Sequence, residues 1–222
     1  MTFQEELIKV FSEHANEDNA LAMSAYMKHK FTFFGIKSQE RKALLKQVES
    51  RHKEALVFNC REVVLALFQQ PQRELHYCAQ EILTKYLKKK YLIEDIDLIK
   101  KLLTTQSWWD SVDHISKWIL GFYLKQYPSE INHTINEFSN SDNMWLVRST
   151  ILYQLGYKKE TNEAILFQQC LNHKTSNEFF IQKAIGWALR EYAKVNPEAV
   201  LNFVKRANLK PLSTREAIRN IL

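Results

Sequence analysis

Glycine and proline are scarce in this sequence, each occurring only four times in 222 residues. Tight turns and strand bends rely on these two residue types, so their scarcity argues against a fold rich in β-hairpins. It favours long helices joined by short connections. Pro71, Pro128 and Pro211 fall between apolar-periodic segments, where such connections are expected.

Cysteine is also rare, and the three cysteines, Cys60, Cys78 and Cys170, lie far apart with no C-x-x-C pair. This pattern excludes a disulfide framework and a cysteine-based metal site, and it is typical of a reduced intracellular protein. No apolar run reaches the length of a membrane span, and the acidic start Met1–Glu6 does not have the character of a secretory signal. We therefore expect a cytoplasmic protein with no membrane partner.

The phosphate-binding, dinucleotide-binding, zinc-protease and serine-hydrolase motifs are all missing, and the seven histidines show no ligand spacing. We therefore predict no cofactor and no metal. His114, although it follows Asp113, is interpreted as a surface or hydrogen-bonded histidine rather than a base.

Helical periodicity is what the sequence does contain. Apolar residues recur at helical spacing in three segments, beginning at Phe3, at Leu75 and at Ile181. Ser38 before Gln39 and Asn196 before Pro197 fit helix N-caps. No alternating strand is evident.

A weak internal repeat indicates how these helices are organised. Trp109, Trp145 and Phe180 each open a helix-like segment, with spacings of 36 and 35 residues. A period in the mid-thirties with two helices per unit is typical of an α-solenoid of the HEAT type. We expect residues 1–222 to form a single all-α domain, a curved HEAT-like array with a concave basic groove.

Two tryptophans followed by carboxylates, in the run from Ser107 to Asp113, mark the most distinctive segment. In a helix, Trp109 and Asp113 lie one turn apart on one face, and the apolar track Val112, Ile115, Ile119 and Phe122 points elsewhere. The alternative is a half-buried tryptophan beside a solvated aspartate, and from these residues alone that alternative is the better one.

Positive charge is concentrated toward the C-terminus. Residues 1–150 contain 20 Lys and Arg against 19 Asp and Glu, whereas residues 151–222 contain 11 against 6. Lys183, Trp187, Arg190 and Lys194 fall on the side of their helix opposite its apolar stripe. Aromatic and basic residues interleaved on one face suit nucleic-acid binding. Solubilising lysines, and a tryptophan covered by lysine stems, are the alternatives.

Longer strings make the chain similar to a known family. They span Tyr26–Lys28, Phe34–Ile36, Ser107–Asp113, Ser141–Arg148, Phe179–Trp187, Leu189–Tyr192 and Pro211–Ile218. The chain resembles the AlkD-type DNA glycosylases of the AlkC/AlkD alkylation-repair group, which are HEAT-like solenoids. The resemblance covers nearly the full length, and it implies Trp109, Asp113, Arg148 and Trp187 as the catalytic set.

The resemblance implies hydrolysis of the N-glycosidic bond of cationic N3- and N7-alkylpurines, such as 3-methyladenine and 7-methylguanine, in duplex DNA, as in base excision repair. We expect a monofunctional, monomeric enzyme, with Asp113 stabilising the sugar cation and Arg148 contacting phosphate and orienting Asp113. The expected DNA-binding residues are Tyr26, Lys28, Lys183, Arg190 and Lys194. The alternative is a non-catalytic HEAT scaffold that binds DNA or a protein partner.

Overall fold

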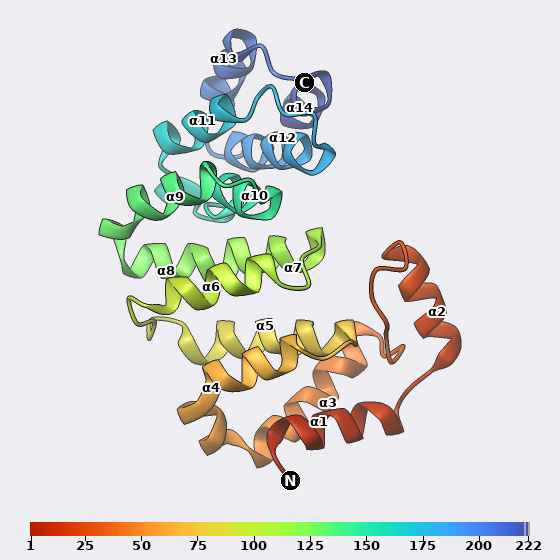
Figure 1. Cartoon of the computed structure of the whole chain (residues 1–222). Helices are drawn as coiled ribbons and strands as arrows, with labels where there is room; N and C mark the ends of the chain where they lie inside the picture. The colour runs from red at the N-terminus through yellow and green to blue at the C-terminus, as the bar shows by residue number, and fades with distance from the viewer. Residues whose placement is uncertain (220, 222) are drawn as a thin grey trace. The chain divides into compact units, whose positions relative to one another are not determined.

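The computed structural model describes residues 1–219 and residue 221, and the chain divides into two compact units, Met1–Tyr91 and Leu92–Leu222. Helices make up both units (Figure 1). Within the described residues, extended pairing is limited to one isolated bridge between Thr32 and Gln72. The predicted all-α, solenoid-like class is therefore confirmed, whereas the concave basic groove and the single domain stay predictions.

The first unit contains five helices among its described residues, and their bounds are α1 Phe3–Glu13, α2 Glu17–Tyr26, α3 Ser38–Arg51, α4 Lys53–Phe68 and α5 Arg73–Leu87. The predicted apolar stripes are buried, as shown by Phe3 and Leu7 of α1 and by Leu75 and Ile82 of α5. Lys37 rather than Ser38 is the N-cap of α3, because Ser38 is already helical. The Ser38 cap prediction was therefore wrong by one residue.

A buried carboxylate ties the loop before α3 to α5. Glu74 accepts hydrogen bonds from the backbone N–H groups of Phe34, Gly35 and Ile36 at 3.1, 2.9 and 3.2 Å. Gly35 has a φ of +87°, and a Cβ built there would lie 2.0 Å from the carbonyl oxygen of Asn16. Only glycine fits this position, so the loop depends on both residues.

The second unit carries the remaining elements. Their bounds are α6 Asp95–Thr104, α7 Trp109–His114, η1 Ile115–Leu120, α8 Gly121–Gln126, η2 Pro128–Glu130, α9 Ile131–Ser139, α10 Met144–Leu152, η3 Lys158–Glu160, α11 Glu163–Asn172, α12 Phe179–Ala193, α13 Pro197–Ala207 and α14 Pro211–Ile218. Asn196 caps α13 by accepting from the N–H of Ala199 at 3.1 Å, and Pro197 is the first helical residue. That cap prediction is confirmed.

Helices α7 and α8 form one continuous helix, because η1 between them is a π-helical turn with helical backbone angles at both junctions. Val112, Ile115 and Ile119 are fully buried, as predicted. Phe122 is only partly buried, and Tyr123 is fully buried instead. The wider π turn adds a residue and moves the core position from Phe122 to Tyr123.

The hydrophobic core of the second unit gathers around α12. Ile181, Ala184, Ile185, Ala188 and Leu189 are buried in it, which confirms the predicted stripe. None of the described helices is long and apolar enough to cross a membrane.

We expect Glu74→Gln to lower the free energy of unfolding by about 3 kcal/mol, because the neutral amide presents one acceptor oxygen and turns its own N–H groups toward buried donors. Urea unfolding followed by circular dichroism measures the change. Glu54→Gln on the exposed face of α4 is the matched control and should leave the midpoint unchanged. Equal midpoints for Glu74→Gln and wild type would contradict this account of the loop.

Candidate active site

Trp109 and Asp113 lie on α7, at the start of the long continuous helix in the second unit. Trp108 is the N-cap residue, with extended backbone angles (φ −155°, ψ 163°), and Trp109 is the first helical residue. Both Trp109 and Asp113 are partly buried. Asp113 therefore stands one turn above Trp109 on the same face, as the spacing predicts.

Asp113 and Arg148 form a bidentate ion pair between α7 and α10. The Nε of Arg148 donates to Oδ1 of Asp113 at 2.8 Å, and its Nη2 donates to Oδ2 at 3.0 Å. The third arm, Nη1, donates to the carbonyl oxygen of Phe180 on α12. One guanidinium thus joins three helices, and its planar fork fixes the orientation of the carboxylate.

The expected role of Arg148 has two parts, and the structure supports one of them. The geometry agrees with a residue that orients Asp113. The side chain is only 4% exposed, however, and each of its three nitrogen atoms already donates within the protein. Its burial therefore argues against direct contact with a DNA phosphate.

Burial raises the pKa of Asp113 above its ordinary value of 3.8 because it disfavours the charged form, and Asp110 raises it further. The hydrogen bonds and the positive charge of Arg148 act in the opposite direction. The side chain of Asp113 keeps 16% of its surface exposed, so the carboxylate can be approached from one side. The result is an oriented, partly desolvated anion.

An aromatic cluster that was not predicted from the sequence lies beside Arg148, and Phe180 joins it to the ion pair. The rings of Trp108, Trp145 and Phe180 contact one another, with centroids 5.7 Å apart for the two tryptophans and 5.1 Å from each to Phe180. The spacing of 36 and 35 residues between aromatic residues is the sequence signal for this cluster. Counted from Trp109, however, it points to the wrong tryptophan, because the ring that contacts Trp145 and Phe180 is that of Trp108.

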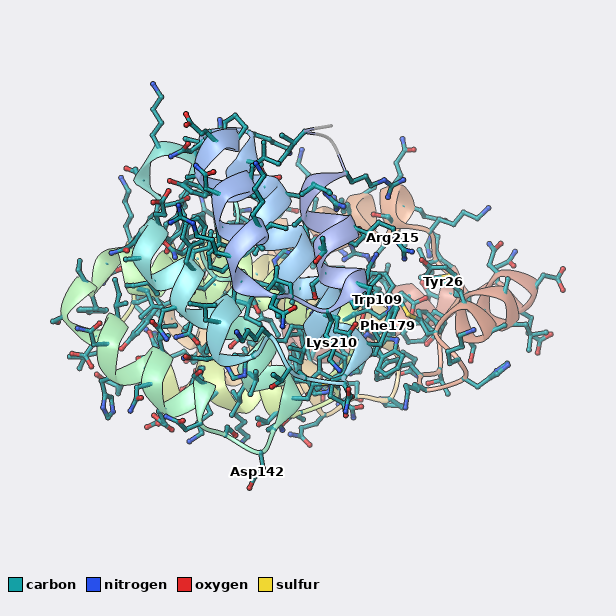
Figure 2. All side chains as sticks on the ribbon, turned by 90° about the horizontal axis from the view of Figure 1, so that it is seen from above. Tyr26, Trp109, Asp142, Phe179, Lys210 and Arg215 are labelled. Carbon is teal, nitrogen blue, oxygen red and sulfur yellow. The ribbon has the colours of Figure 1, made fainter. Side chains whose placement is uncertain are left out.

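Phe179 extends the cluster toward solvent. Its ring is 58% exposed and lies edge-on to Phe180 at 5.4 Å. Trp109 and Phe179, which open α7 and α12, are labelled in Figure 2. An exposed phenylalanine beside a partly buried aromatic cluster is a surface suited to stacking.

The face of α12 that carries Trp187 differs from the prediction. Trp187 is partly buried and packs against the hydrophobic core of the unit, so it does have a packing role. Lys183 and Arg190 form ion pairs with the Glu216 carboxylate of α14, at 3.0 and 2.7 Å. The side of α12 opposite its predicted apolar stripe is therefore not a free surface, because α14 packs along this helix.

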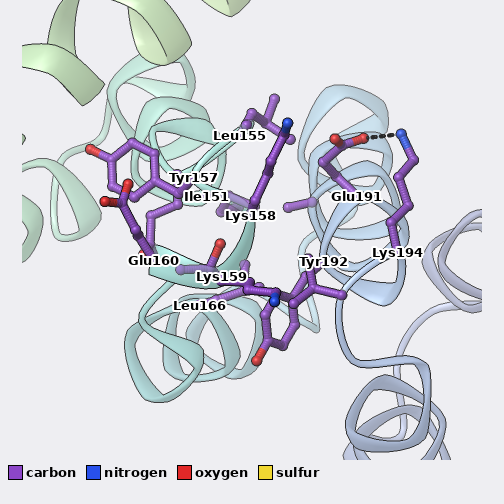
Figure 3. Close-up of a pocket in the computed structure, with 15 residues that line it drawn as sticks. Ile151, Leu155, Tyr157, Lys158, Lys159, Glu160, Leu166, Glu191, Tyr192 and Lys194 are labelled. Atoms are coloured by element: carbon purple, nitrogen blue, oxygen red, sulfur yellow. Dashed lines mark hydrogen bonds and ion pairs between the residues drawn. The ribbon is translucent and has the colours of Figure 1, made fainter.

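Lys194 lies at the C-terminal end of α12 and pairs with Glu191 at 2.5 Å (Figure 3). It borders a cavity of about 760 Å³ with an apolar wall that includes Leu155 and a rim that includes Lys158. None of the four predicted catalytic residues lines this cavity. It is therefore distinct from the Asp113–Arg148 pair.

Tyr26 and Lys28 belong to the first unit. Tyr26 is 70% exposed at the end of α2 and lines a cavity of about 390 Å³ together with Phe33 and Tyr77. Lys28 is exposed and adopts a left-handed conformation, with φ of 58°. Both side chains are accessible to a ligand, and their role as DNA contacts stays a prediction.

Metal ligation finds no support in residues 1–219 and 221, where no group of three or more His, Cys, Asp or Glu side chains could hold an ion. The described site offers a carboxylate fixed by Arg148, with the indole of Trp109 one turn from it on the same helix.

Comparisons with known proteins agree on one family. The model of the DNA alkylation repair enzyme family matches residues 7–221. Among solved structures, the chain is similar to a protein described as a predicted DNA alkylation repair enzyme from Enterococcus faecalis. The two share 34% sequence identity and a TM-score of 0.83, over 93% of this chain and 96% of that chain. No curated protein matches the sequence.

We expect the Asp113 carboxyl to titrate above 3.8 and to titrate higher still in Arg148→Met, because that change removes the hydrogen bonds and the charge that lower its pKa. Carbon-13 NMR of aspartate-labelled protein measures both titrations, with Asp113→Asn providing the assignment. An unchanged Asp113 titration in Arg148→Met would show that the ion pair does not hold in solution.

Proposed function

The chain belongs to the DNA alkylation repair enzyme family, and on that premise we propose that it is a monofunctional DNA glycosylase. Its substrates are cationic N3- and N7-alkylated purines in duplex DNA, and it releases them by hydrolysis of the N-glycosidic bond. The observation that carries this proposal is the oriented Asp113 carboxylate, held by Nε and Nη2 of Arg148 one turn above Trp109.

The chemistry of the substrate matches what this site offers. An alkylpurine that already carries a positive charge leaves as a neutral base, so no acid is needed to protonate it. The main barrier is then the positive charge that develops on the sugar. A carboxylate fixed before the reaction stabilises that charge without having to reorient, and it can also position the attacking water.

Aromatic rings can also stabilise the positive charge that develops on the sugar. The faces of Trp109 and Trp187 are electron-rich and attract cations. The Arg148 side chain is only 4% exposed and lies 5.9 Å from the ring centre of Phe180, and this burial strengthens the electrostatic interactions of the pair. In this proposal, Trp109 and Trp187 contact the lesion, while the partly buried cluster of Trp108, Trp145 and Phe180 only supports the ion pair.

We expect Asp113→Asn to reduce release of 7-methylguanine by more than a hundredfold, since one preorganised electrostatic group contributes about 3 kcal/mol to transition-state stabilisation. Free base released from methylated duplex DNA is measured by chromatography. Affinity for the DNA should persist or increase, because a carboxylate facing phosphates repels them.

The matched control is Asp142→Asn, which removes the same charge from an exposed side chain that projects into solvent (Figure 2). This control should release base at the wild-type rate. Equal release by wild type and Asp113→Asn would contradict the proposed mechanism. Absence of release by wild type would leave the non-catalytic scaffold.

We propose that duplex DNA binds through cations of the second unit, and we expect its affinity to fall steeply with salt. A plot of log K against log salt concentration should fall with a slope of about 0.9 for each phosphate neutralised. Lys194→Gln should weaken binding and lower that slope by about one. Lys9→Gln on α1, where Lys9 is exposed and pairs with Glu13, is the control. Fluorescence anisotropy across a salt series gives both values, and affinity that is insensitive to salt would reject the basic groove.

A further inference from the structure

Glu216 lies at the contact between α12 and α14. Helix α14 approaches α12 at Gly186, where an added Cβ would lie 2.4 Å from the Cβ of Glu216 and 3.0 Å from the carbonyl oxygen of Ser213. The hydroxyl of Ser213 also donates to the carbonyl oxygen of Gln182 at 3.0 Å. Because the backbones are this close, the start of the Glu216 side chain has a fixed place against α12.

The carboxylate of Glu216 divides its two oxygens between two cations of α12. Its Oε1 lies 3.0 Å from Nζ of Lys183, and its Oε2 lies 2.7 Å from Nη1 of Arg190. Trp187 stands between these cations in the sequence and on the same helical face, at i, i+4 and i+7. The two cations are therefore held on either side of the indole.

Exposure shows the order of these groups toward solvent. The side chain of Glu216 is 11% exposed, that of Arg190 is 22% exposed and that of Lys183 is 36% exposed. The cations thus cover the carboxylate and keep surface available for an anion. The Lys183 and Arg190 hydrogen bonds hold the pKa of Glu216 below its ordinary value, so the carboxylate stays ionised at neutral pH.

We propose that Glu216 is a positioning residue for the repair reaction, which aims Lys183 and Arg190 at the DNA phosphates on either side of Trp187 and so sets the place of the indole at the lesion. This inference rests on the proposed glycosylase function. The partner is the phosphate backbone, because two spaced cations flanking an aromatic ring match two phosphates flanking a sugar and base.

Positioning and attraction act in opposite directions in this arrangement. The negative charge of Glu216 repels phosphate, so its removal increases the attraction of DNA to this face. The same removal releases two long side chains from fixed directions, and a misplacement of about 1 Å at a reacting centre can cost a hundredfold in rate. A residue that only stabilised the fold would instead change affinity and rate together.

The test compares Glu216→Gln with wild type in single-turnover base release and in DNA binding. We expect the rate on saturating methylated duplex DNA to fall roughly tenfold, while the Kd stays the same or decreases. The matched control is Glu137→Gln on α9, which removes a carboxylate paired with Lys100 at 2.5 Å. That control should leave both quantities unchanged.

A second set of variants distinguishes a loss of positioning from a folding defect. In the Lys183→Met/Arg190→Met background, a further Glu216→Gln change should not alter the rate, since the residue acts only through these cations. Glu216→Asp, which keeps the charge on a shorter side chain, should recover part of the rate if Glu216→Gln unfolds.

The outcomes separate this inference from the function on which it rests. If wild type releases no base, the proposed function and this inference both fail. If wild type is active and Glu216→Gln matches its rate, or loses affinity and rate in parallel, only the positioning role is rejected. The positioning role is also rejected if Glu216→Gln slows the reaction equally in the wild-type and Lys183→Met/Arg190→Met backgrounds.

Discussion

The ion pair between Asp113 and Arg148 is the interaction on which the second unit's site depends. Removing a carboxylate and a guanidinium from water is costly, and only good geometry with every donor engaged offsets that cost. Here two arms of Arg148 bind Asp113 and the third binds the carbonyl oxygen of Phe180. The loss of either partner would leave a buried charge, so the pair specifies how α7, α10 and α12 meet.

Its surroundings help to explain why this pair can be both structural and chemical. The Arg148 side chain is buried and lies 5.9 Å from the ring centre of Phe180, while Asp113 keeps 16% of its side-chain surface exposed. Charge–charge interactions are stronger where water is excluded. An oriented carboxylate whose accessible side is narrow is therefore suited to act on one developing positive charge.

Periodicity predicted the helices and the buried stripes well, because burial of an apolar face dominates local structure. It failed where tertiary packing decides: α14 covers part of the α12 face, so Trp187 packs on the core and Lys183 and Arg190 meet Glu216. No local pattern identifies which neighbour a helix face will meet.

The π turn in the helix that carries Asp113 has a consequence for the spacing of its core residues. The buried positions Val112, Ser116, Leu120 and Leu124 recur every fourth residue, whereas an ideal α-helix has 3.6 residues per turn and such a row would wind around its surface. A wider turn corrects that drift and keeps the row straight. Deletion of one residue within Ile115–Leu120 could be accommodated by conversion of the wide turn to an α-helical one, whereas insertion of one further residue without a second wide turn would rotate α8 by about 100° relative to Asp113. The length of this helix is therefore constrained against insertion, even where its side chains are far from the chemistry.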